Sequence, residues 1–512
     1  MDNIELSLFS SRISAICEEM GAVLQRAAFS PNIKDRLDYS CAVFDRSGDL
    51  CAQAAHIPVH LGSMAFAMQN IVEDREWSEG DTLILNDPFL GGTHLPDVTL
   101  VTPIFYQSTL LGFIANRAHH ADIGATSPGS MPLSKSIEEE GLLINPCLLI
   151  KAGVTDQTLL DKLLAGVSDK TQSLGDFSAQ ISANQLGLTR VLGLISEMGE
   201  PKYVQALIEL NQYAERVAQS ALSLIPDGSY EFNDVMDDDG LGNKNIEIKV
   251  KISVHGDKIK IDFSGTADQV RGNINCPLSV AAAGVYYVFR CLMPSYTPAC
   301  IGSFRNIAIY APEGCLLNAM SPAAVAAGNV ETSTRVVDVV MGALAQAIPE
   351  KLAAASQGSM NNIAMGARNS EGAWNYYETM GGGMGASCSS PGLSAVQTHM
   401  TNTLNTPIES LEIHFPLRIS RYTLRENSGG EGLFHGGDGL IREFEFLAPA
   451  QVTLLTERRL HCAWGLEGGN EGNCGENFYN DTLLPSKISL NVTINDKITI
   501  KTPGGGGYGK LQ

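Results

Sequence analysis

Apolar residues recur every three or four positions in three stretches of the chain, which is the spacing of an amphipathic helix. The first 28 residues form one such stretch, and Ser30–Pro31 ends it. Residues 156 to 225 form the second, and Pro226–Asp227–Gly228 stops it. The third runs from Val336 to Ile348 and is almost entirely apolar, so we expect a buried helix there. On the second stretch, the predicted buried face carries Val204, Leu207, Ile208 and Val217.

Short apolar runs bounded by turn residues predict strands, among them Thr82–Leu85 and Val98–Val101. Residues 246 to 263 alternate apolar and polar side chains on both sides of a His-Gly-Asp turn, which is the pattern of a β-hairpin. Residues 488 to 500 repeat that alternation around an Asn-Asp turn. We therefore expect a second hairpin near the end of the chain.

A chain of 512 residues exceeds what one hydrophobic core usually holds, so we expect several subdomains. The order of the patterns predicts a mixed α+β fold, with an α/β N-terminal part and a β-rich C-terminal half. We place an α/β domain at 1–226, a domain of hairpin and helix at 227–350, and a β-rich, glycine-rich domain at 351–512. The stop at Pro226–Asp227–Gly228 sets the first of these boundaries.

The charge balance and the cysteines narrow the class of protein. With 56 acidic against 35 basic residues, the net charge is −21, which argues against nucleic-acid binding. There is no run of 18 apolar residues, and the first five residues lack the basic start of a signal peptide, so we expect a cytoplasmic protein without a membrane segment. Eleven cysteines without a C-x-x-C pair predict reduced, mostly buried thiols.

Histidine and aspartate gather at the ends of two strand-like runs. Five of the chain's 10 histidines lie between residues 56 and 120. In one run His94 and Asp97 are three residues apart, so one turn can direct both side chains at one ion. The second run ends in His119, His120 and Asp122, and either histidine can complete the set. Such mixed nitrogen and oxygen donors suit zinc, manganese or iron, so the N-terminal domain is predicted to bind a metal. The alternative is a hydrogen-bonded polar cluster that orients loops.

Two further pairs of residues each have two alternative roles. Asp35-x-x-Asp38 follows the first predicted helix, and either carboxylate can reach the same centre or form a local cap with Arg36. His56 and His60 have the two-residue spacing that places both on one face of a strand. They are candidates for support of the metal ligands or for general bases, and the alternative is two hydrogen-bonded core histidines.

Three other sequence features give weaker indications of function. Asp237–Asp238–Asp239–Gly240 lacks the spacing of an EF-hand loop, so we expect a solvated turn. Gly504–Gly509 resembles a mobile glycine-rich terminus. No G-x-x-x-x-G-K-[ST] motif occurs, so ATP, if used, would be held by another chain.

Several long motifs, in the same order, make the chain resemble a known family over essentially its whole length. They are Asp38–Tyr39–Ser40–Cys41–Ala42, His56 through Met64, Asn86 through Asp97, Gly328 through Ser333, Gln397 through Thr403, Gly436 through Gly439 and the glycine-rich terminus. This order is similar to that of the B-type subunit of the hydantoinase/5-oxoprolinase family, which also includes lactam hydrolases and acetone and acetophenone carboxylases.

The resemblance implies an A-type partner subunit in a heterotetramer or larger assembly. That partner would bind ATP and magnesium and phosphorylate the carbonyl oxygen of a small cyclic amide. By motif, the divalent-metal ligands of this chain would be His94, Asp97 and His119, with Asp38 as a fourth. From residue type alone, His60 and Glu331 are the groups expected to move protons.

These expectations define three competing functions. The first is ATP-dependent hydrolysis of hydantoin, 5-oxoproline or another lactam, with a metal-activated water as nucleophile. The second is ATP-dependent carboxylation of a ketone of the acetone or acetophenone type. The third is a non-catalytic support for the A-type subunit, which would need no stoichiometric metal, whereas the catalytic functions predict roughly one ion per chain.

Overall fold

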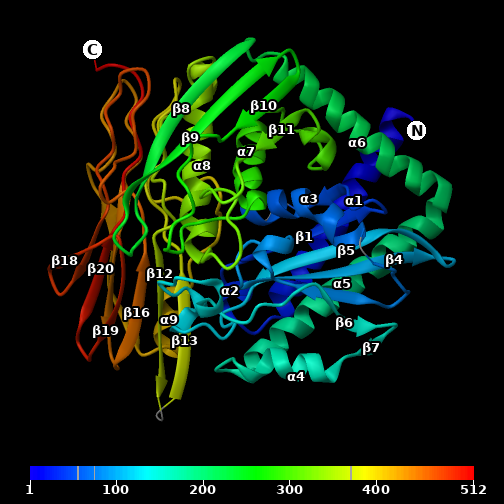
Figure 1. Cartoon of the computed structure of the whole chain (residues 1–512), viewed down its shortest axis with the longest axis horizontal. Coiled ribbons are helices and arrows are strands. Elements are labelled where there is room, and N and C mark those ends of the chain that lie inside the picture. The colour runs from blue at the N-terminus through cyan, green and yellow to red at the C-terminus, as the bar shows by residue number, and fades with distance from the viewer. Residues whose placement is uncertain (55–56, 74, 370–371, 512) are drawn as a thin grey trace.

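The computed structural model describes residues 1–54, 57–73, 75–369 and 372–511. Helices and several separate β-sheets form a mixed α+β fold, as the sequence patterns predict (Figure 1). None of the helices in these ranges is long and apolar enough to cross a membrane. The helices are α1 (Asn3–Ala27), α2 (Pro31–Lys34), α3 (Pro58–Glu73), α4 (Gln157–Ala165), α5 (Lys170–Met198), α6 (Glu200–Leu222), α7 (Leu278–Leu292), α8 (Ser333–Leu344) and α9 (Ile408–His414).

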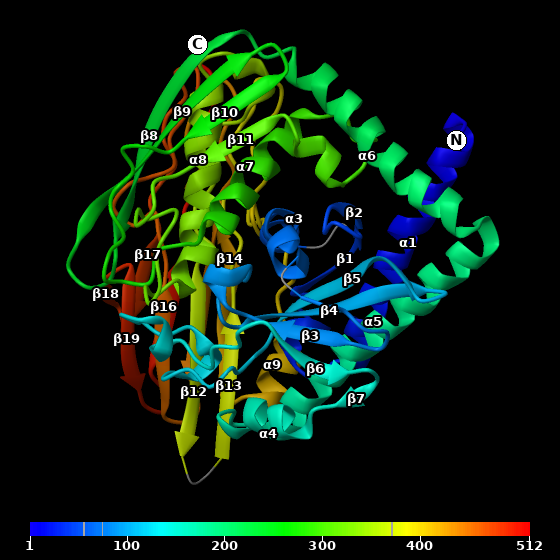
Figure 2. The ribbon, with the colours of Figure 1, turned by 45° about the vertical axis from the view of Figure 1, so that its right-hand side comes forward.

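A seven-stranded antiparallel sheet of order β2-β1-β5-β4-β3-β6-β7 organises the N-terminal part. Helices α1 and α5 pack on one of its faces, and α3 packs on the other (Figures 1 and 2). The strands predicted at Thr82–Leu85 and Val98–Val101 are confirmed as β3 and part of β4. The sheet consists of β1 (Tyr39–Asp45), β2 (Leu50–Gln53), β3 (Thr82–Leu85), β4 (Asp97–Tyr106), β5 (Thr109–His119), β6 (Cys147–Lys151) and β7 (Val154–Thr155).

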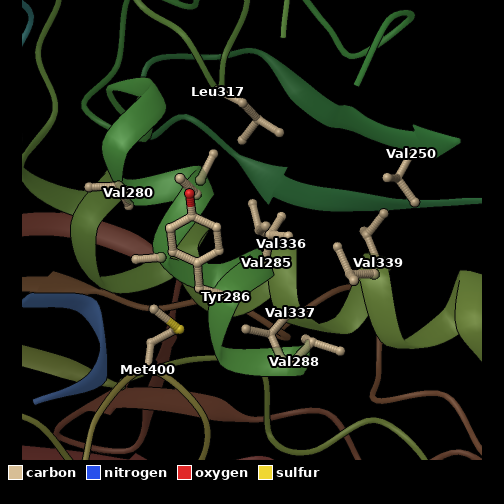
Figure 3. Close-up of a cluster of buried hydrophobic side chains, with 14 of the residues drawn as sticks. Val250, Val280, Val285, Tyr286, Val288, Leu317, Val336, Val337, Val339 and Met400 are labelled. Atoms are coloured by element: carbon tan, nitrogen blue, oxygen red, sulfur yellow. The ribbon is translucent and has the colours of Figure 1, made fainter. Parts of the chain in front are cut away.

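The second layer is a four-stranded sheet covered by helices α7 and α8. Its strands are β8 (Gly228–Asp238), β9 (Lys244–His255), β10 (Lys258–Asp262) and β11 (Ile307–Tyr310), in the order β11-β10-β9-β8. The predicted hairpin is confirmed, because Lys258 pairs with His255 across the β9–β10 turn. The buried helix predicted from Val336 is α8, whose valines pack against those of α7 beneath the sheet (Figure 3).

The C-terminal part is a sandwich of two sheets, of order β13-β12-β16-β19 and β14-β15-β20-β17-β18, whose inner faces share one core. The hairpin predicted at residues 488–500 is wrong: β19 pairs with β16, whereas β20 pairs with β15 and β17. The Asn-Asp turn therefore carries the chain from one sheet to the other, and alternation alone does not reveal the partner of a strand. The strands are β12 (Asn362–Asn369), β13 (Gly372–Glu378), β14 (Leu417–Arg425), β15 (Gly439–Phe446), β16 (Ala450–Leu455), β17 (Glu476–Tyr479), β18 (Thr482–Leu484), β19 (Lys487–Val492) and β20 (Lys497–Lys501).

The glycine-rich terminus is buried, which corrects the expectation of a mobile tail. The amide of Gly505 donates to the carbonyl of Gly437 at 3.0 Å, and its own carbonyl accepts from Gly430 at 2.8 Å. A Cβ at Gly505 would lie 2.2 Å from the carbonyl oxygen of Met384. The backbones are thus packed too closely for any side chain, and their amide groups pair with one another.

Two other local expectations are corrected. Asp237 and Asp239 are fully buried, not solvated. The carboxylate of Asp237 accepts the backbone amides of Arg459 and His461 in a neighbouring loop, and that of Asp239 accepts those of Leu241 and Asn243 in its own turn. On α6, Leu207 is buried as predicted, but Val204 and Ile208 are 36% and 45% exposed. Alanines and Tyr203 occupy the buried face instead, so the true face is rotated relative to the predicted one.

The expectation that all cysteines are reduced is wrong for one pair. A disulfide joins Cys462 to Cys474 across 12 residues. The amide of Gly475 donates to the carbonyl of Arg458 at 2.8 Å, which holds the two loops side by side. The largest hydrophobic core includes side chains from Ile57 to Leu455, so it crosses both predicted boundaries, at 226 and 350. The division into three domains stays a prediction.

Candidate metal centre

The pairing of β4 with β5 brings the first pair of predicted ligands together. Asp97 begins β4, His119 ends β5, and the two residues are directly opposite each other in the antiparallel register. The loop before β4 turns tightly, because a Cβ at Gly92 would lie 2.4 Å from the carbonyl oxygen of Asn86. This turn places His94 beside Asp97, as the spacing of three residues predicts.

Three donor groups converge in this place. One ligand atom from each of His94, Asp97 and His119 lies within 4.8 Å of the other two, and all three side chains are buried. Oδ1 of Asp97 lies 3.2 Å from Nε2 of His94 and 3.2 Å from Nδ1 of His119. Among the described residues, Nε2 of His94, Oδ1 of Asp97 and Nε2 of His119 have no hydrogen-bond partner. Buried polar atoms are normally satisfied, so this cluster fits a cation that is shared by the three side chains.

The backbone sets the tautomer of His94. Its Nδ1 lies 3.3 Å from the carbonyl oxygen of Ala326, and a carbonyl only accepts hydrogen bonds. The proton of a neutral His94 is therefore on Nδ1, which leaves the lone pair of Nε2 directed toward Asp97. A metal-binding histidine needs this arrangement, with the far nitrogen donating and the near one free.

The electrostatics of Asp97 and His119 also suit a cation, whereas at His94 the attraction of Asp97 outweighs burial and raises the pKa. Burial acts to raise the pKa of Asp97, but the adjacent imidazoles of His60, His94 and His119 hold it well below its usual range. Burial lowers the pKa of His119. The centre therefore offers an ionised carboxylate and a neutral imidazole, which are the protonation states that ligate divalent ions.

Asp97 is further held by groups that sequence reasoning missed. Its Oδ2 accepts from Oγ1 of Thr93 at 2.6 Å and from Nδ2 of Asn329 at 3.2 Å. Asn329 belongs to a π-helical turn, Gly328–Thr332, just before α8. The Gly328–Ser333 motif was the only signal in the sequence for this contact, and it did not show which member faces the site.

Asp38 and His60 also border the centre. His60 lies in the first turn of α3, not on a strand as predicted, because the helix begins at Pro58. Its Nε2 is 3.1 Å from Oδ2 of Asp97 and 3.9 Å from Oδ1 of Asp38. Asp38 Oδ2 is 4.0 Å from Nδ1 of His119 and 3.8 Å from the guanidinium of Arg36. The other histidine of that predicted pair, His56, lies outside the described residues.

The remaining sequence candidates point elsewhere. Nε2 of His120 lies 2.9 Å from Oε1 of Gln180, and its ring packs on Phe177. The carboxylate of Asp122 accepts the backbone amides of Gly124 and Ser168. The geometry therefore groups His119, not His120, with His94 and Asp97.

A small cavity of about 20 Å³ adjoins the donors, large enough for about one water molecule. The side chains of His60, His94 and His119 line it, together with Asp38. Its remaining walls come from Ile57, Val59, Asn329, Val330, Met360, Tyr377, Thr379, Met400, Thr401 and Thr403. Asp35, the other carboxylate of the Asp35-x-x-Asp38 pair, does not line this cavity.

Comparison with known proteins identifies the relatives of this chain. Residues 2–511 match the Hydantoinase B/oxoprolinase family. The chain belongs to this family. It is 40% identical to 5-oxoprolinase 1 of Arabidopsis thaliana over 99% of its own length, yet it spans only 42% of that larger protein. It is 32% identical to a B-type D-/L-hydantoinase chain of a Pseudomonas species, covering 99% of this chain and 90% of that one.

Two solved structures share the fold of this hydantoinase B/oxoprolinase chain. The ATP-dependent caprolactamase of Pseudomonas jessenii superposes with a TM-score of 0.92 at 26% identity, covering 100% of this chain and 91% of the other. A nucleotide-free acetone carboxylase superposes with a TM-score of 0.88 at 17% identity, covering 99% of this chain and 76% of the other. At that lower identity, the second likeness concerns the fold alone.

Glu331 lies behind the cavity of this family member, not in its lining. Its Oε1 accepts from Nδ2 of Asn362 at 2.7 Å, and Oδ1 of Asn362 accepts from the hydroxyl of Tyr377 at 2.6 Å. The Tyr377 ring stacks on His119 with 4.8 Å between ring centres. Burial, together with the nearby Glu457, raises the pKa of Glu331 to about 7.

Proposed function

We propose that this chain is the B-type subunit of an ATP-dependent cyclic amide hydrolase. Membership of the hydantoinase B/oxoprolinase family and the fold shared with a caprolactamase support the reaction class. The observation that carries the proposal is the group of His94, Asp97 and His119, in which Nε2 of His94, Oδ1 of Asp97 and Nε2 of His119 are buried without hydrogen-bond partners among the described residues. A purely structural polar cluster would satisfy such atoms internally.

The chemistry of a ring amide explains the need for ATP. Resonance makes the amide carbon a poor electrophile, so water alone opens the ring slowly. Transfer of the terminal phosphoryl group of ATP to the carbonyl oxygen creates a good leaving group on that carbon. We assign this step to an A-type partner subunit with its own magnesium ion. Water then adds to the carbon, the C–N bond breaks, and the nitrogen takes up a proton, which leaves an acyl phosphate. A second water molecule releases phosphate from it and leaves the carboxylate of the ring-opened product.

The second half-reaction is assigned to this chain. His94, Asp97 and His119 would hold a zinc, manganese or iron ion, with Asp38 as a fourth ligand. A divalent ion held there would supply Lewis acidity, which would make hydroxide accessible near neutral pH. His60 borders the cavity 3.1 Å from Asp97, so its imidazole is placed to accept or return a proton.

A different role is proposed for Glu331. Its carboxyl group accepts from Asn362, which in turn accepts from Tyr377, so we assign it the role of positioning the tyrosine ring that stacks on His119. We expect Glu331→Gln to retain activity while shifting its pH profile. Direct proton transfer by Glu331 stays a prediction from residue type.

The substitution His94→Ala tests the proposed function in the reconstituted complex. We expect the loss of ATP-coupled ring opening and of bound metal, while phosphoryl transfer by the partner stays measurable. His120→Ala is the matched control, since it removes the neighbouring imidazole that bonds Gln180 instead of the centre. Unchanged hydrolysis in His94→Ala would refute the role of the metal centre.

Ketone carboxylation is the second candidate function, and the fold shared with acetone carboxylase is compatible with it. An enol phosphate would then react with carbon dioxide or carboxyphosphate in place of water. ATP hydrolysis is to be measured with hydantoin, 5-oxoproline and caprolactam, and separately with small ketones plus labelled bicarbonate. Stimulation by ketones with label incorporation would favour carboxylation. A complex without stoichiometric metal would favour the non-catalytic support role.

A further inference from the structure

Segment 325–329, which lies just before α8, contacts the metal centre at two points. The carbonyl oxygen of Ala326 lies 3.3 Å from Nδ1 of His94, and Nδ2 of Asn329 lies 3.2 Å from Oδ2 of Asp97. Each of these contacts joins residues that are 232 positions apart in the chain. The orientation of both ligands therefore depends on where the rest of the fold holds this segment.

A buried carboxyl group holds the beginning of the segment. Glu140 is fully buried, and its Oε1 accepts the backbone amides of Val325 at 2.9 Å and Ala326 at 3.0 Å. The same oxygen accepts from the hydroxyl of Ser134 at 2.7 Å. Only the two backbone dihedrals of Ala326 separate its held amide from the carbonyl that faces His94. The position of this carbonyl is thus set by Glu140.

Hydrogen bonds within the segment extend this support to its other end. The carbonyl of Val325 accepts the amides of Gly328 at 3.0 Å and Asn329 at 3.4 Å. A Cβ at Gly328 would collide with the carbonyl oxygen of Asn275, so the segment is also packed closely against a neighbouring loop. Asn329 is therefore held in place at the point where its side chain reaches Asp97.

The support does not depend on the charge of Glu140. Burial raises the pKa of its carboxyl group to about 7. An oxygen of a carboxyl group can accept hydrogen bonds in the ionised form and in the protonated form. Burying such a group costs free energy, and both backbone amides that it binds belong to the segment that faces the metal centre.

We propose that Glu140 is a positioning residue for the metal centre, holding segment 325–329 against His94 and Asp97. This inference rests on the proposed function, because it needs both residues to be metal ligands. Loss of a group that directly supports a ligand typically weakens metal binding about 10- to 100-fold. Glu140 acts through the segment, so we expect its loss to have an effect at the lower end, about 10-fold.

Calorimetric titration of the full chain with zinc, against a competing chelator, tests the proposal. For Glu140→Ala we expect the zinc affinity to fall about 10-fold. Glu140→Gln keeps an acceptor oxygen in the same place, so its affinity should stay within about threefold of the wild type. Asp81→Ala is the matched control, because buried Asp81 also accepts two backbone amides, those of Ser78 and Ala152. These amides lie in segments that carry none of the three donors, so this control should unfold more readily and bind zinc normally.

A second measurement separates the geometry of the centre from a general loss of stability. Cobalt(II) in place of zinc reports the arrangement of its ligands through its visible absorption. The absorption bands should change in Glu140→Ala and stay the same in Asp81→Ala. If Glu140→Ala does not fold, Glu140→Asp replaces it in both measurements, because the shorter side chain draws the acceptor oxygen away from segment 325–329.

The outcomes separate this inference from the proposed function. Full zinc affinity in the Glu140 variants, or equal losses in Glu140→Ala and Asp81→Ala, would overturn the positioning role alone. Equal losses in Glu140→Gln and Glu140→Ala would also overturn it, since the charge and not the position would then matter. A wild-type chain that does not bind zinc would overturn the proposed function and the positioning role together. If zinc binding follows the expected pattern but the complex shows no ATP-coupled ring opening, the positioning role stands and the proposed function fails.

Discussion

Replacing Asp97 with asparagine removes one charge from the centre of the site and keeps the shape of the side chain. Oδ1 of Asp97 faces both His94 and His119 at 3.2 Å, and Oδ2 accepts from Thr93 at 2.6 Å. Loss of a group that only supports a ligand typically weakens metal binding 10- to 100-fold, so loss of the ligand charge should cost at least about 100-fold.

This weakening has a calculable effect on unfolding. With free metal at 100 times the wild-type Kd, binding stabilises the wild-type chain by about 2.7 kcal/mol. A variant that binds 100-fold more weakly gains only about 0.4 kcal/mol at the same metal concentration. The metal-dependent increase in the free energy of unfolding should therefore differ by about 2 kcal/mol between the two chains.

Urea unfolding of both chains, with zinc or manganese and with a chelator, measures this difference. Asp87→Asn is the matched control, because Asp87 accepts the amide of Phe89 in the same loop and is not one of the three grouped donors. Its metal-dependent shift should equal that of the wild type. A wild-type chain that is indifferent to metal, or an Asp97→Asn chain with the full shift, would refute the assignment of the centre.

On folding, the pKa of Glu331 rises from its ordinary 4.5 to about 7. Between these two pH values the folded state binds more protons than the unfolded state, so the free energy of unfolding falls as the pH rises. Glu331→Gln should lack this loss, and its stability relative to wild type should increase by on the order of 3 kcal/mol between pH 4.5 and 8 in urea titrations. Cys462→Ser should lower the free energy of unfolding by about 2–3 kcal/mol, because it opens a loop of 12 residues, and thiol titration of the wild type should find 9 free cysteines. Identical unfolding curves with and without reductant would contradict the disulfide. Gly505→Ala should destabilise the chain by several kcal/mol, because its Cβ would lie 2.2 Å from a carbonyl oxygen, whereas Gly193→Ala on α5 meets nothing within 4 Å and should be neutral or stabilising by up to about 1 kcal/mol. Equal melting temperatures for these two variants would contradict the close packing of the terminus.

Local patterns in the sequence determined much of the architecture. The apolar period predicted the N-terminal helix and the buried helix α8, a short apolar run predicted strand β3, and alternation predicted the β9–β10 hairpin. The three-residue spacing of His94 and Asp97 also placed both side chains together. In each case the interacting residues are neighbours in the chain, so short-range geometry suffices.

Tertiary structure decided whatever depends on a distant partner. The register of β4 against β5 selected His119 over His120, and the start of α3 at Pro58 brought His60 to the same centre. Sheet pairing separated β19 from β20, and packing of backbone against backbone buried the glycine-rich terminus. Periodicity reports which side of a segment is buried, but it contains no information about which remote segment covers that side.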